Sequence, residues 1–116
     1  MGRLTTHVLD TAHGRPAAGM RYALFRLDGE AREKLAEGAT NADGRTEGLL
    51  LEGVAVRPGR YQLVFQVAAY FRAQGVSLPE PPFLDEVTLA FGLGDAAHYH
   101  VPLLASPFGY TTYRGS

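Results

Sequence analysis

Apolar and polar residues alternate with a period of two along most of the chain, and glycine, proline, asparagine and aspartate interrupt the alternation at short intervals. This pattern is typical of short, mostly antiparallel strands in a β-sandwich or β-barrel. The first predicted strand sends alternate side chains to opposite faces. One face carries Leu4, Thr6 and Val8, and the opposite face carries Thr5, His7 and Leu9. His7 is therefore expected on the face opposite Leu4 and Val8.

The remaining elements follow from the same alternation and from its interruptions. Further strands are predicted over residues 20–27, 31–39, 59–67, 84–91, 98–106 and 109–114. Helix formers at 68–74, followed by Gly75, predict the one short helix. The Asn-Ala-Asp-Gly stretch at 41–44 predicts a tight turn that presents Arg45 directly after it.

Length and composition limit what the chain can be. Its 116 residues suit one domain, so we assign residues 1–116 to a single domain. With 46% hydrophobic residues and no cysteine, the core has to be stable without disulfides. The lack of cysteine also excludes thiol nucleophiles and cysteine-ligated zinc sites. Catalysis, if there is any, then depends on histidines and carboxylates.

The charge pattern argues against nucleic acid and membrane partners. Eleven Lys and Arg residues oppose twelve Asp and Glu residues, which gives a formal net charge of -1 without a basic cluster. The N-terminal residues carry charge and hydroxyl groups where a secretory signal needs a continuous apolar stretch. No apolar run reaches membrane-spanning length. We therefore expect a cytoplasmic protein.

Four histidines are the candidates for acid–base chemistry, because imidazole titrates near neutral pH. His98 and His100 stand two apart in a predicted strand, so their side chains leave the same face and could relay a proton or bind a metal. By themselves, these residues and His7 also fit an exposed polar sheet face, and Arg45 fits an ordinary loop arginine. His13 lies in a loop rich in glycine and proline, where we expect it to be solvated.

Both ends of the chain carry long motifs, at residues 4–17 (LTTHVLDTAHGRPA) and 98–116 (HYHVPLLASPFGYTTYRGS). They resemble the two signatures of the transthyretin-related 5-hydroxyisourate hydrolase family. The middle of the chain fits as well, with NADGR at 41–45 and GRY at 59–61, so the resemblance covers essentially the whole chain. It implies an all-β, transthyretin-like sandwich of two sheets, with about eight short strands and one short helix.

The site residues that the resemblance implies fall into two groups. The catalytic group is His7, Arg45 and His100. The substrate-binding group, in the C-terminal ending, is Tyr113, Arg114 and Ser116. His98 stands where the family varies, so a supporting role and no role both stay open. Ala105 is a minor departure, because many members carry a larger aliphatic residue there, and we expect it to affect packing and not chemistry.

The resemblance implies hydrolysis of 5-hydroxyisourate, the unstable product of urate oxidation. The N1–C6 amide would open to give 2-oxo-4-hydroxy-4-carboxy-5-ureidoimidazoline. Because no Ser-His-Asp arrangement is apparent and cysteine is absent, we expect direct attack by water that His7 or His100 activates. Arg45 would bind the planar ring and stabilise negative charge. No cofactor or metal is expected. The family assembles as a homotetramer, a dimer of dimers with sites between the dimers, and we expect the same here.

Three other interpretations stay open on the sequence alone. A transthyretin-like carrier would bind a planar aromatic ligand in the same cleft without turning it over, although the bulk of Tyr113 favours a shallow pocket. A zinc site would need His7, His98 and His100 to converge, which the alternation permits. A non-catalytic β-sandwich adhesion module would leave the pattern of histidine and arginine unexplained.

Overall fold

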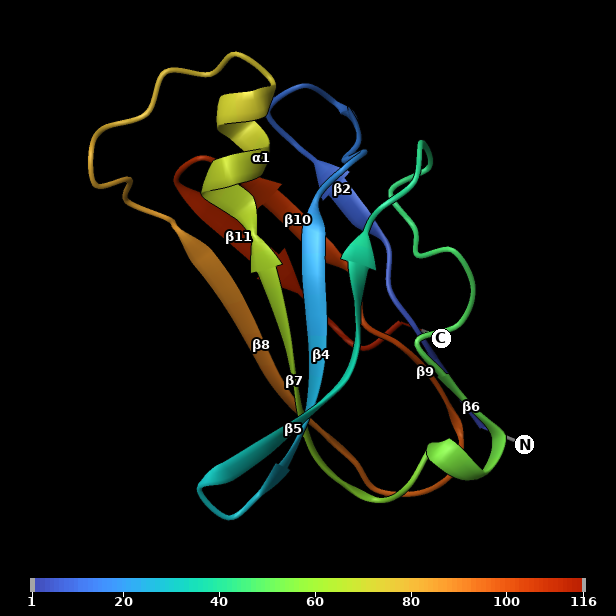
Figure 1. Ribbon diagram of the computed structural model, residues 1–116. Coiled ribbons are helices and arrows are strands. Elements are labelled where there is room, and N and C mark those ends of the chain that lie inside the picture. The colour runs from blue at the N-terminus through green and yellow to red at the C-terminus, as the bar shows by residue number, and fades with distance from the viewer. Residues whose placement is uncertain (1, 116) are drawn as a thin grey trace.

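Two facing layers of β-strands make up the computed structural model, which describes residues 2–115 (Figure 1). One layer is an antiparallel sheet with the strand order β5-β4-β7-β8. Its strands are β4 (Arg21–Asp28), β5 (Ala31–Ala39), β7 (Gly59–Gln66) and β8 (Glu86–Leu93). Helix α1 (Val67–Ala73) continues directly from β7. No helix within residues 2–115 has the length and apolar character needed to cross a membrane.

The second layer holds the strands nearest both chain ends, in the orders β6-β1-β9 and β11-β10-β2-β3. Its strands are β1 (Arg3–Thr5), β2 (Val8–Asp10), β3 (Arg15–Pro16), β6 (Leu51–Glu52), β9 (His98–His100), β10 (Leu103–Ser106) and β11 (Gly109–Thr112), and a 3-10 helix, η1 (Gly53–Ala55), follows β6. β1 runs parallel to β9, and β2 runs parallel to β10 in the same register. The N-terminal segment and the segment 98–106 therefore lie side by side along the layer.

Residues 2–115 contain eleven strands, more than the eight or so that were predicted. Two of the predicted strands, 4–9 and 98–106, are each interrupted, and the two-residue strands β3 and β6 were not predicted. Pro102, at one interruption, has no N–H to donate to a ladder. At the other, Thr6 Oγ1 donates a hydrogen bond to the Val101 carbonyl (2.7 Å). The sandwich architecture itself is as predicted.

The alternation predicted for the first strand is confirmed by burial. The buried set, at most 2% exposed, is Leu4, Thr6 and Val8, and the partly exposed set is Thr5, His7 and Leu9. Alternate residues of β7 are also fully buried, and these are Tyr61, Leu63 and Phe65. Full burial of each large apolar side chain stabilises the fold by about 1.5–3 kcal/mol. The layers thus pack through their apolar faces, which leaves the His7 face outside the core.

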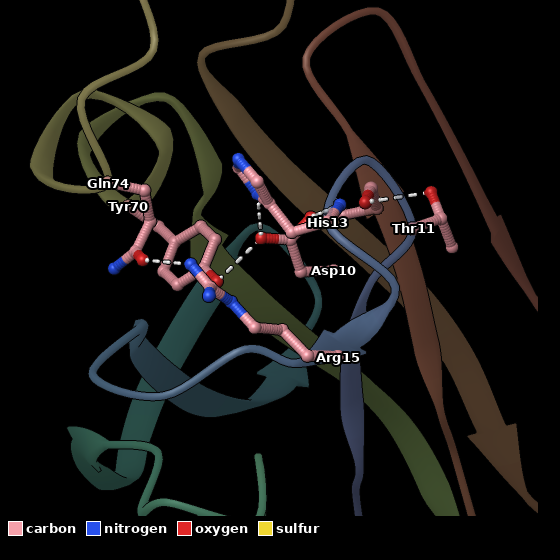
Figure 2. Close-up of polar contacts among 7 residues, drawn as sticks. Asp10, Thr11, His13, Arg15, Tyr70 and Gln74 are labelled. Atoms are coloured by element: carbon pink, nitrogen blue, oxygen red, sulfur yellow. Dashed lines mark hydrogen bonds and ion pairs between the residues drawn. The ribbon is translucent and has the colours of Figure 1, made fainter.

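A polar cluster of Asp10, His13 and Tyr70 joins α1 to the loop after β2 (Figure 2). Tyr70 donates a hydrogen bond to Asp10 Oδ2 (2.8 Å), and His13 Nδ1 lies 2.6 Å from the same oxygen. His13 is an exposed residue, as predicted, but its ring also contacts Asp10, and its side chain is 32% exposed. The reason for this contact is a tight turn, in which Gly14 N–H donates to the Asp10 carbonyl (2.9 Å) and His13 folds back over Asp10.

Burial and hydrogen bonding together set the charge of this Asp10 cluster. Burial alone would raise the pKa of Asp10, but hydrogen bonds from Tyr70 and His13 outweigh it and leave the pKa below its ordinary value of 3.8. Burial and the adjacent carboxylate raise the pKa of Tyr70 to about 12. Arg15 donates to Gln74 Oε1 (2.9 Å) beside the cluster (Figure 2). At neutral pH, a buried carboxylate that accepts hydrogen bonds from Tyr70 and His13 therefore fastens α1 to the second layer.

Candidate active site

A groove of about 470 Å³ lies over β1 and β9. Its lining residues are Arg3, Thr5, Arg45, His98, Tyr99 and His100. In Figure 1, this part of the molecule lies beside the labelled chain ends, away from α1. Arginine guanidinium groups present planar sets of N–H donors, and imidazoles can donate or accept hydrogen bonds. Together in one groove, they suit a planar ligand that accepts hydrogen bonds or carries negative charge.

His100 lies among three neighbours that act on its imidazole. It pairs with Thr5 across the parallel strands β1 and β9, and its Nδ1 lies 2.8 Å from Thr5 Oγ1. Burial, the Arg45 guanidinium and His7 all lower the pKa of His100 below its ordinary value of 6.5. The imidazole is therefore neutral at neutral pH, as a general base has to be.

His7 lies beside Arg45, because the two residues form an isolated antiparallel bridge. The Nε2 of His7 is 2.8 Å from the Asp43 carbonyl oxygen. A carbonyl only accepts hydrogen bonds, so Nε2 carries a proton and Nδ1 is the basic nitrogen of the neutral ring. His7 does not line the groove itself. It is nevertheless close enough to His100 to lower the pKa of that residue.

The turn before Arg45 has the tight geometry that the sequence predicted. Asn41 Oδ1 accepts hydrogen bonds from the backbone N–H groups of Asp43 (2.9 Å) and Arg45 (3.1 Å). Gly44 has a φ of 76°, and a Cβ at this position would collide with the Val8 carbonyl. The Val8 N–H donates to the Gly44 carbonyl (2.8 Å). Only glycine fits here, and the close packing on β2 holds Arg45 at the groove.

Gly115 brings the C-terminal segment onto His100. Its N–H donates to the His100 carbonyl (2.7 Å), and a Cβ on Gly115 would stand 2.7 Å from His100 Cδ2. The Arg114 guanidinium carbon lies 4.2 Å from the centroid of the Tyr99 ring, and Nη2 lies 3.5 Å from the His98 carbonyl. The C-terminal backbone thus packs against the His100 ring, while Arg114 packs on Tyr99.

Tyr113 and Arg114 line a second hollow rather than the groove. This hollow, of about 700 Å³, has walls from β8 and β11, and Tyr99 lines both spaces. It is larger than the groove, but no histidine lines it, so the groove is the better candidate for acid–base chemistry. Ser116, the third residue predicted to bind substrate, lies outside the described residues.

The three imidazoles that the zinc interpretation needs do not converge. Among residues 2–115, no three His, Asp or Glu side chains lie close enough together to hold a metal ion. His98 and His100 do share the groove, as their spacing predicted. The groove therefore brings His98, His100 and Arg45 together with His7 next to them.

Three groove residues, Arg3, Thr5 and Tyr99, were not among the candidates from the sequence, and Thr5 is the one that contacts a candidate base through its side chain. The alternation put it on the His7 face, but its partner His100 is 95 residues away along the chain. Parallel pairing between two such distant segments leaves no local pattern in the sequence. The available signal was that both residues belong to the two terminal motifs.

Comparisons with known proteins agree with this geometry. The HIUase/Transthyretin family model matches residues 4–115. The chain is 63% identical to the 5-hydroxyisourate hydrolase of Mesorhizobium japonicum, over 99% of this chain and 93% of that protein. Its structure is similar to that of Klebsiella pneumoniae 5-hydroxyisourate hydrolase, with a TM-score of 0.82, 35% identity and both chains fully covered.

A second solved structure covers a longer protein. The chain is similar to the crystal structure of (S)-allantoin synthase, with a TM-score of 0.94 and 44% identity over 99% of this chain. It spans only 44% of the length of that chain. Both structural neighbours share the sandwich described above, and the family model matches nearly all of its residues. The chain belongs to the HIUase/Transthyretin family.

Proposed function

We propose that this chain is a hydrolase of purine breakdown that opens 5-hydroxyisourate at the N1–C6 amide and releases 2-oxo-4-hydroxy-4-carboxy-5-ureidoimidazoline. One observation supports this activity most strongly. The groove joins His100 and Arg45, with His7 adjacent, in a chain that is 63% identical to a 5-hydroxyisourate hydrolase over nearly its full length. A neutral imidazole beside a guanidinium is what water activation at an amide carbon requires.

The reaction needs a base, a water molecule and a proton for the leaving nitrogen. The water oxygen attacks C6 while one imidazole takes a proton from the water. The tetrahedral intermediate then breaks the C6–N1 bond, and N1 receives a proton as the carboxylate forms. His7 and His100 share these two proton transfers, and either of them can be the base. No covalent bond to the protein forms in this sequence of steps.

Arg45 has two functions in this scheme. Its planar fork of donors binds the urate-like ring and stabilises the negative oxygen of the tetrahedral intermediate. Its positive charge also lowers the pKa of His100, which keeps that imidazole unprotonated. One side chain thereby favours both the active form of the base and the charged intermediate.

The C-terminal residues Tyr113, Arg114 and Ser116 bind substrate in this proposal. Tyr113 and Arg114 line the hollow on the far side of Tyr99, and Gly115 packs on the His100 ring. A substrate seated on His100 would therefore lie next to this segment. His98, which lines the groove with an exposed side chain, is available for a supporting contact.

The active form is a homotetramer built as a dimer of dimers, with the cytoplasm as its expected compartment. The groove is open on a single chain, and large side chains near β11 are exposed, among them Phe108, Tyr110 and Tyr113. Exposed apolar surface of this kind is typical of contacts between subunits. Light scattering should report about four chains per particle, and a fully active monomer would contradict a site shared between dimers.

Loss of the substrate signal tests the activity directly. Urate oxidase generates 5-hydroxyisourate in the cuvette, and the decay of its ultraviolet absorbance is followed with and without this protein. Accelerated decay with turnover of excess substrate is expected. Stoichiometric binding of the substrate without accelerated decay would favour a carrier instead.

A further inference from the structure

Thr5 makes the one side-chain hydrogen bond that holds the His100 ring in the described residues. Thr5 and His100 face each other across β1 and β9, and Thr5 Oγ1 lies 2.8 Å from His100 Nδ1. The backbone of Thr5 is also fixed, because its carbonyl accepts a hydrogen bond from Val101 N–H (2.9 Å). As a β-branched residue, Thr5 has few side-chain rotamers, so its hydroxyl oxygen is held in place.

The direction of this hydrogen bond decides which nitrogen of His100 can act as a base. A neutral imidazole carries one proton on two nitrogens. If Thr5 donated to Nδ1, the proton would lie on Nε2, and the only basic nitrogen would be occupied by Thr5. If Nδ1–H donates to Thr5, Nε2 keeps a free lone pair.

We propose that Thr5 is a positioning residue for His100: its Oγ1 accepts a hydrogen bond from Nδ1–H, which leaves Nε2 as the basic nitrogen. This role rests on the proposed function, in which His100 exchanges protons with substrate or water. Burial and the charge of Arg45 keep the ring neutral, so the choice between the two nitrogens matters at neutral pH. Gly115 packs against Cδ2 on the other side of the ring and restricts its rotation.

The two candidate bases then have opposite tautomers. In His7, the Asp43 carbonyl fixes the proton on Nε2 and leaves Nδ1 basic. In His100, Thr5 fixes the proton on Nδ1 and leaves Nε2 basic. A carbonyl enforces its tautomer because it can only accept, whereas a hydroxyl can also donate, so the His100 tautomer is the one that needs to be measured.

Three variants and one spectroscopic measurement test the role of Thr5. Thr5→Val keeps the shape and removes the hydroxyl, and Thr5→Ser restores a hydroxyl. Thr11→Val is the matched control, because Thr11 also bonds to the second layer through its hydroxyl, to the Ala105 carbonyl (3.0 Å), outside the groove. Nitrogen-15 NMR of the imidazole rings reports which nitrogen of His100 is protonated.

In the wild-type protein, we expect the His100 proton on Nδ1. Thr5→Val should lose that preference and lower kcat about tenfold, the effect of one lost hydrogen bond, with KM nearly unchanged. Thr5→Ser should recover most of the preference for Nδ1 protonation and most of the kcat. Thr11→Val should match the wild type in both measurements. A wild-type proton on Nε2, or a Thr5→Val protein with unchanged spectrum and turnover, would overturn the proposal.

The outcomes separate this inference from the proposed activity. If the wild-type protein does not hydrolyse 5-hydroxyisourate, the activity is wrong, and the NMR spectrum still decides the direction of the Thr5 hydrogen bond. If the wild type is active and Thr5→Val is equally active, only the role of Thr5 is wrong.

Discussion

At the scale of single residues, the protonation of His100 depends on groups that lie around its ring. Burial, Arg45 and His7 all act in the same direction and lower the pKa below 6.5. A base with a lowered pKa is unprotonated at pH 7 and becomes protonated only when the pH falls through that lower value. The loss of turnover on acidification is therefore expected to have its midpoint below pH 6.5, the ordinary value for histidine.

Removing the charge of Arg45 should raise the pKa of His100. We expect the midpoint of the His100 NMR titration to move upward in Arg45→Met, because a nearby positive charge disfavours the imidazolium. Arg3→Met is the control, since Arg3 lines the same groove but is not among the groups that shift this pKa. An unchanged midpoint in Arg45→Met would remove Arg45 from the electrostatics of His100.

Gly115 tests how closely the C-terminal segment fits the His100 ring. A methyl group at this position would stand 2.7 Å from Cδ2, so Gly115→Ala has to displace either the ring or the segment. We expect kcat to fall at least about tenfold with the fold retained, as small displacements of a base cost that much. Gly94→Ala is the control, because a Cβ there meets open space. Normal turnover in Gly115→Ala would show that this contact is irrelevant to the chemistry.

At the scale of secondary-structure elements, the Asp10 cluster fastens α1 to the second layer. Tyr70→Phe removes one donor from a buried carboxylate and should lower the free energy of unfolding by about 1–3 kcal/mol in urea denaturation at neutral pH. Turnover per folded chain should stay unchanged, because the cluster lies away from the groove. Tyr22→Phe removes a tyrosine hydroxyl outside both the Asp10 cluster and the groove, and should leave both quantities unchanged.

The same cluster gives the protein a defined response to acid. The folded pKa of Asp10 is below its ordinary value of 3.8, so its stabilisation is complete above that value and is lost as the pH falls through the lower, folded pKa. Tyr70→Phe raises the folded pKa by removing a hydrogen bond to the carboxylate. Its acid-unfolding midpoint, measured by circular dichroism, should therefore lie at higher pH than in the wild type. An identical midpoint would contradict this role of Asp10.

The elements themselves could be predicted well where the determinants are local. Alternation located β4, β5 and β7, and Gly75 marked the end of α1. The interruption near Thr6 could not be predicted, because it depends on a hydrogen bond to a residue 95 positions away. The cluster that forms beside the exposed His13 could not be predicted for a similar reason, since Tyr70, which completes it, lies 60 positions beyond Asp10.

At the scale of the whole molecule, the groove combines segments from the start, middle and end of the chain. The two-residue spacing of His98 and His100 in a strand was enough to predict that they share one face of the sheet. Only the family resemblance predicted that they lie in the same site as His7 and Arg45. Residue periodicity describes one strand at a time, whereas the parallel pairing of β1 with β9 is a property of the complete sandwich. For the same reason, the sequence could not show that Tyr99 separates Arg114 from the groove.

The central claim is that His7, Arg45 and His100 form one catalytic unit for the hydrolysis of 5-hydroxyisourate. The most direct measurement is turnover of enzymatically generated 5-hydroxyisourate by His100→Ala, with His13→Ala as the matched control. His13 is a histidine too, but it belongs to the Asp10 cluster, outside the groove. We expect His100→Ala to lose at least about a hundredfold in kcat, the lower range for a general base, and His13→Ala to retain turnover per folded chain. Near-normal turnover by a folded, correctly assembled His100→Ala protein would contradict the account.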